Sequence, residues 1–161
     1  MTRLQPLAAA LLAAGLLAHA APAAAQTEVS ATAAGAGTFP QGAVLLGLPL
    51  RTLSLGVGVG VAGSWATGQF QATLTGALPL GGDRHIVVDG RANAATPAAP
   101  GTALFSGTAR VDPGDGTPPV SGVPFTAVLV ANPDGTGRLS LTVAGTSLPA
   151  ATLDEGYVTV Q

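Results

Sequence analysis

The chain has 161 residues, 47% of them hydrophobic and only 9% charged, and its formal net charge at pH 7 is −2. Its six basic side chains are all arginines, which leaves no dense basic patch for nucleic acids or anionic membrane surfaces. Because it has no cysteine, it can form neither a disulfide framework nor a thiol nucleophile.

The first 25 residues are predicted to be a secretory signal peptide. Arg3 gives a basic start, residues 7–18 form an apolar run too short to span a bilayer, and residues 23–25 offer a small-residue cleavage site. We therefore expect a mature chain that starts near Gln26 and is secreted, either extracellular or periplasmic, without a membrane anchor. The lysine-free, alanine-rich composition is typical of a bacterial protein.

The mature chain divides into a predicted leader and a predicted domain. Residues 26–40 are mostly small and polar, with too few large side chains to bury, so we expect a flexible leader. Residues 41–161 are long enough for a single domain with its own core.

Alternation of apolar and polar residues predicts strands along this domain in chain order. We expect strands at residues 43–48, 52–62, 69–75, 84–89, 103–111, 125–130, 138–143 and 157–161, with loops at 93–101 and 147–155. The prolines of the first loop cannot donate to a ladder, and the Asn132–Gly137 stretch is rich in turn residues.

No helical periodicity follows the signal peptide, so the predicted class is all-β. About eight short strands separated by Gly, Pro and Asp turns favour an antiparallel β-sandwich, with a small β-barrel as the alternative. Phe70, Phe105 and Phe125 fall on inferred inward faces.

The strand at 52–62 carries the candidate binding residues. Gly56, Gly58 and Gly60 occupy its second face, and glycine inside a strand needs a reason because it is destabilising. One explanation is that a second layer of the fold covers the glycines, and this explanation is favoured. The alternative is that a ligand or another copy of the chain docks on this face, which would allow self-association through the strand. Trp65 is the remaining candidate binding residue, although a lid over the end of the core is the favoured interpretation.

The histidine at position 85 is the one candidate general base of the mature chain. On a strand it shares a face with Asp83 and Asp89, so a small hydrolase is one hypothesis. No G-x-S-x-G elbow supplies a nucleophile, and a solvated surface histidine is the favoured interpretation.

Cofactor and metal patterns are weak. Gly58-x-Gly60-x-x-Gly63 matches the dinucleotide fingerprint, but an alternating strand follows where a helix is required, so no cofactor is predicted. One histidine in the mature chain and no cysteine disfavour zinc. The Asp residues near 112–115 and 132–134 are better explained as turn residues than as calcium ligands.

These observations favour a secreted, non-enzymatic module of the cell-surface, matrix or adhesion type, with a structural or binding role. The small hydrolase is one alternative. An outer-membrane β-barrel is another, suggested by the alternating strands but weakened by the few aromatic residues and by Gln161 at the C-terminal position.

Overall fold

The structure, a computed structural model, describes residues 28–161, and the predicted signal peptide lies outside this range. All its regular elements are strands: β1 (Glu28–Thr38), β2 (Val44–Leu45), β3 (Leu48–Ala62), β4 (Trp65–Ala77), β5 (Asp83–Thr96), β6 (Thr102–Asp112), β7 (Val120–Ala131), β8 (Gly137–Val143), β9 (Thr146–Ser147) and β10 (Ala151–Val160). Every pairing between them is antiparallel. The predicted all-β antiparallel class is therefore confirmed.

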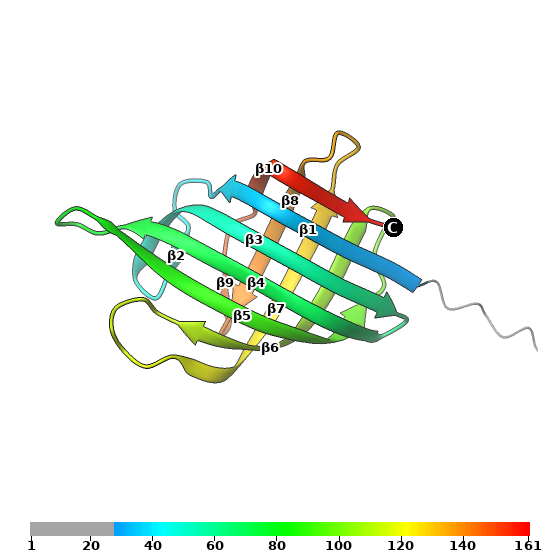
Figure 1. Ribbon diagram of the computed structural model, residues 1–161, viewed down its shortest axis with the longest axis horizontal. Coiled ribbons are helices and arrows are strands. Elements are labelled where there is room, and N and C mark those ends of the chain that lie inside the picture. The colour runs from blue at the N-terminus through cyan, green and yellow to red at the C-terminus, as the bar shows by residue number, and fades with distance from the viewer. Residues whose placement is uncertain (1–27) are drawn as a thin grey trace, which may run out of the picture.

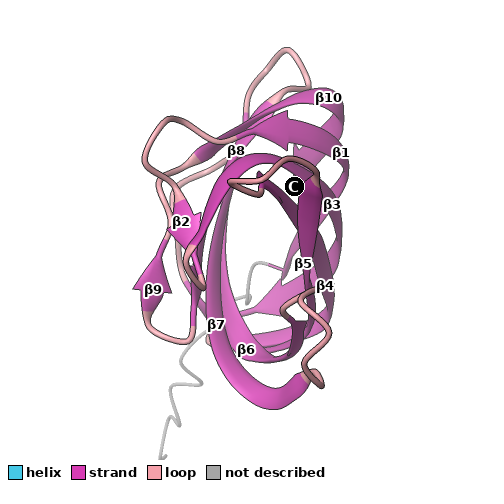
Figure 2. Ribbon diagram, turned by 90° about the vertical axis from the view of Figure 1, so that its left-hand side faces the viewer, coloured by secondary structure: helices cyan, strands magenta, loops and turns pink. Residues whose placement is uncertain are grey.

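The sheet closes on itself. Consecutive long strands pair from β3 to β8, β8 then pairs with β10, and β1 pairs with both β10 and β3. The closed sheet is flattened, so that β1, β3, β4 and β5 face β6, β7 and β8 across the interior (Figures 1 and 2). The fold thus has two facing layers, as predicted for a sandwich, and continuous strand pairing around them, as expected of the alternative, a small barrel.

The core fills the space between the two layers with apolar side chains. In the described residues no polar or charged residue is buried, because alternation sends every second side chain outward. The predicted inward faces are confirmed: Phe70, Phe105, Leu74, Ile86, Leu139 and Leu141 are all at most 1% exposed.

The predicted flexible leader is wrong for residues 28–38, which form β1. This strand pairs along its whole length with β3, and Ala31 and Ala33 are buried in the core. Its small residues are needed where the sheet closes, because an added side chain at Gly35 would overlap the backbone carbonyl of Glu155 on β10. A composition that resembles a disordered segment is here the result of close strand packing.

Two predicted loops are also shorter than expected. β5 continues to Thr96 across a bulge between Ala92 and Ala94, and a bulge interrupts the apolar alternation that sequence analysis uses. β10 begins at Ala151, although Asp154 and Glu155 interrupt its apolar pattern. The first predicted strand is only the two residues of β2.

The two ends of the closed sheet differ in the chain ends and strand connections that lie there. Both ends of the domain lie at one of them (Figure 1), where Ser30 and Gln161 exchange backbone hydrogen bonds of 2.7 and 3.0 Å. The β3–β4, β5–β6 and β7–β8 connections lie at the same end. We call it the terminal end, and the candidate functional site is there.

Candidate functional site

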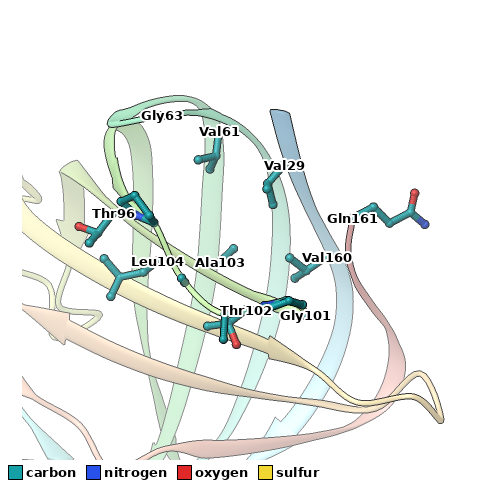
Figure 3. A pocket seen from close by; sticks show the side chains of 14 residues that line it. Val29, Val61, Gly63, Thr96, Gly101, Thr102, Ala103, Leu104, Val160 and Gln161 are labelled. Atoms are coloured by element: carbon teal, nitrogen blue, oxygen red, sulfur yellow. The ribbon is translucent and has the colours of Figure 1, made fainter. Parts of the chain in front are cut away.

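The terminal end contains a hollow of about 560 Å³, which we call the end hollow. It lies beneath the β5–β6 loop, residues 97–101, and is lined by Val29, Val61, Gly63, Val160, Gln161 and residues 96–104. Figure 3 shows Val29, Val61 and Val160 projecting from β1, β3 and β10 into the space beside this loop, and the amide of Gln161 directed away from it.

The lining of the end hollow carries no ionisable side chain. Its polar side chains are those of Thr96, Thr102 and Gln161. A hollow of this volume with mostly apolar walls and a few polar groups is the usual form of a small-molecule site. It suits an uncharged ligand, because no lining side chain could form an ion pair with a charge that loses its hydration there.

The loop over the end hollow is held in place by backbone bonds and prolines. The Thr102 N–H donates to the Ala99 carbonyl at 3.0 Å, and the Ala131 N–H donates to the Gly101 carbonyl at 2.8 Å. Pro97 and Pro100 restrict the loop further, since each fixes its own φ. The hollow is therefore largely formed before any ligand arrives.

A second hollow of about 680 Å³ adjoins the first on the outer face of the sheet, and we call it the outer hollow. Val29, Val61 and Gln161 line both. The other residues that line it are Glu28, Ser30, Gly60, Ala62, Trp65, Ala66 and Thr67. It thus brings together two of the four candidate binding residues, Gly60 and Trp65.

The other two candidates, Gly56 and Gly58, do not line either hollow. The expectation that a second layer covers the glycine row is wrong: an added Cβ would have no neighbour within 4 Å at Gly56 or Gly58, and at Gly60 only the Thr67 carbonyl oxygen at 3.9 Å. The row lies on the open outer face. Both backbone edges of β3 are already paired, with β1 and β4, so another chain cannot add to this strand at its edge.

Trp65 does not cover the end of the core as expected. It is the first residue of β4, it is 72% exposed, and it lies opposite Ala62 on the outer face. The β3–β4 hairpin is so short that the strand pattern extends to its tip, which places the ring on the polar side of the sheet. An exposed indole beside a hollow is available to a ligand.

His85 is also exposed on the outer face of the sheet. Its Nδ1 is 2.9 Å from the Thr75 hydroxyl, directly across from it on β4. Within residues 28–161, no hydrogen bond joins His85 to Asp83 or Asp89, and His85 lines neither hollow. The structure thus supplies a hydroxyl next to the histidine but not the carboxylate partner that the hydrolase hypothesis requires.

The aspartates of the turns are engaged by neighbouring threonines. The Thr136 hydroxyl donates to Asp134 Oδ1 at 2.6 Å and the Thr136 backbone N–H donates to it at 3.0 Å. The hydroxyl bond first, and then the backbone bond, hold the pKa of Asp134 below its ordinary value. Thr117 does the same for the pKa of Asp115, to which Arg84 at 3.9 Å adds a smaller effect.

Neither a dinucleotide site nor a metal site is assembled in the described residues. Gly63 is followed by β4 and not by a helix, so the fingerprint lacks the helix N-terminus that would bind a pyrophosphate. Residues 28–161 hold no group of three or more His, Asp or Glu side chains placed to bind a metal ion. The same range contains no helix that is long and apolar enough to cross a membrane.

No protein-family model, curated protein or solved structure matches this chain.

Most residues that line the two hollows were not predicted from the sequence. Val29, Val61 and Val160 look like ordinary inward strand residues, and the Pro97–Gly101 stretch looks like an ordinary loop. They become a site only because three strand ends and one loop meet at the terminal end. The local signals were Trp65, the single tryptophan next to a hairpin turn, and Gly60 on the bare face of its strand.

Proposed function

We propose that the mature chain is a non-enzymatic binding module that works outside the cytoplasm and holds a small, uncharged, mostly apolar ligand in the end hollow. The observation that carries this proposal is a preformed hollow of about 560 Å³ without an ionisable lining side chain. Both the volume and the lining match those of small-molecule sites.

The distribution of polar groups supports binding over hydrolysis. Acid–base or nucleophilic catalysis needs a base, a nucleophile and an oriented partner at the place where the substrate sits. The candidate base His85 and its neighbour Thr75 are on the open outer face, away from both hollows. A hydrolase that used His85 would therefore have to act on a substrate bound outside both hollows.

The outward side chains support a location in water over the outer-membrane alternative. Strands β3 and β4 direct Thr52, Ser54, Gln69, Gln71 and Thr73 outward and bury most of their large apolar residues inside, although Trp65 is exposed. A barrel in an outer membrane carries the reverse arrangement, with an apolar band facing the lipid.

Filling the end hollow from its loop tests the proposal. The probe is N-phenyl-1-naphthylamine, an uncharged apolar dye whose fluorescence rises in an apolar site. Ala99 is exposed in the loop and lines the hollow, so Ala99→Trp should occupy the hollow without disturbing the core and should weaken binding at least about tenfold.

The matched control is Ala150→Trp, an exposed loop alanine at the opposite end of the closed sheet. Its affinity for the dye should equal that of the unmodified protein. Equal binding by both variants, or no saturable binding by the unmodified protein, would overturn the proposal.

A further inference from the structure

The outer hollow carries a chemistry that the end hollow lacks. Glu28 has the one ionisable side chain of its lining, and Trp65 has the one aromatic side chain. They lie in a single cross-strand row, because Ala62 on β3 is opposite Glu28 on β1 and opposite Trp65 on β4. Residues in such a row project their side chains to the same face of the sheet.

The spacing of this row leaves room for a ligand between the carboxylate and the indole. Neighbouring strands are about 4.8 Å apart, so two spacings separate Glu28 from Trp65 by about 10 Å at the backbone. The floor between them is Ala62, with Gly60 in the next row toward the middle of the strand. Small side chains on the floor let a compact group approach both walls at once.

The two walls select the charge of that group. A carboxylate attracts a cation, and the face of an indole attracts a cation placed within about 6 Å of the ring. The salt bridge found in residues 28–161 joins Arg84 to Asp115, so none of the described arginines forms an ion pair with Glu28. None of the described arginines lines the outer hollow, and Arg91 on β5 is opposite Gln69 on β4.

We propose that the outer hollow binds an organic cation, a quaternary or alkyl ammonium group, between the Trp65 ring and the Glu28 carboxylate. This goes beyond the proposed function and does not depend on it, since Glu28 and Trp65 line the outer hollow and not the end hollow. Because Val29, Val61 and Gln161 line both hollows, an ammonium group that bears an apolar chain could occupy the two together.

Titration with tetramethylammonium chloride tests the proposal on the mature protein. Trp65 is the single tryptophan, so its indole N–H gives one resonance that reports directly on the site. At constant ionic strength set with sodium chloride, this resonance should shift saturably. Neopentyl alcohol, which has a similar shape but no charge, should bind at least about fivefold more weakly, as expected for the loss of a cation–π contact and of charge attraction.

Variants separate the two walls from the general negative charge of the protein. Glu28→Gln should weaken tetramethylammonium binding about threefold to tenfold, and Trp65→Leu should abolish it when binding is followed at the Gly60 amide. Glu155→Gln removes an exposed carboxylate on β10 that does not line the outer hollow, and it should leave the affinity for tetramethylammonium unchanged. An equal effect of Glu28→Gln and Glu155→Gln, equal binding of the alcohol, or no saturable shift would overturn the proposal. Binding of the uncharged dye in the end hollow would survive any of these results.

Discussion

The phenyl rings of Phe70 and Phe125 stack in the core, with centroids 5.2 Å apart and ring planes 19° apart. Phe70 projects from β4 and Phe125 from β7, so this contact joins the two facing layers of the closed sheet. Phe105 on β6 meets both rings edge to face, at 6.1 and 6.3 Å. Gly90 makes room for the cluster, because an added Cβ would come within 2.8 Å of the Phe125 ring.

Removing a ring from this cluster should be among the most damaging changes in the core. Phe125 is 3% exposed, and we expect Phe125→Ala to lower the free energy of unfolding by about 3–5 kcal/mol, because it leaves a cavity between the layers. Urea denaturation measures this loss. Tyr157→Ala, at a residue that is 54% exposed, is the control and should cost under about 1 kcal/mol.

The two faces of β8 should respond very differently to the same change. Leu141 is 1% exposed and its neighbour Ser140 lies on the outer face. Leu141→Ala should lower the free energy of unfolding by about 2–5 kcal/mol, and Ser140→Ala by under about 1 kcal/mol. Equal losses in thermal or urea denaturation would contradict the assigned orientation of the strand.

Alanine should stabilise one glycine position and destabilise another. At Gly58 an added Cβ has no neighbour within 4 Å, so Gly58→Ala should gain about 0.5–1 kcal/mol by reducing the conformational freedom of the unfolded chain. At Gly107 the added Cβ would overlap the backbone carbonyl of Arg91, so Gly107→Ala should lose about 1–3 kcal/mol.

Thermal denaturation of the two alanine variants checks this pair. Their melting temperatures should move in opposite directions from that of the unmodified protein. A loss of stability in Gly58→Ala would mean that the outer face of β3 is covered, contrary to its open geometry.

The pKa of Asp134 should be low, and it should depend on one hydroxyl. Thr136→Val removes the hydroxyl that donates to Asp134 Oδ1 and should raise the pKa of Asp134 toward its ordinary value, about 3.9. A folded-state pKa below the unfolded one stabilises the protein above pH about 4, and this contribution is lost as the pH falls through the folded-state pKa. An NMR titration of the carboxyl carbons measures the pKa values. Thr142→Val, whose hydroxyl instead contacts Ser147, should leave the pKa of Asp134 unchanged.

The strand faces were predictable from the sequence, because side chains alternate strictly and the interior accepts only apolar ones. Leu139 and Leu141 on β8 and Phe70 on β4 are where the alternation places them. β1 was not predictable in this way. Its alanines and glycines allow the backbone of β1 to pack closely between β3 and β10, where the sheet closes, and this requirement arises only in the folded sheet.

The candidate site was predictable only in part. Trp65 and Gly60 were identified from the sequence and do line one hollow, since a rare residue type and a bare strand face leave a local signal. Val29, Val61 and Val160 leave none, because they share the end hollow through the closure of the sheet and are up to 131 positions apart along the chain (160 − 29).

The most direct test of ligand binding in the end hollow is a methyl NMR map of the mature protein with N-phenyl-1-naphthylamine. We expect saturable shifts of the Val29, Val61 and Val160 methyl groups, which line the end hollow. Leu45 and Leu148, buried at the opposite end, should not shift. Shifts concentrated at Leu45 and Leu148, or no shift at the three valines, would contradict ligand binding in the end hollow.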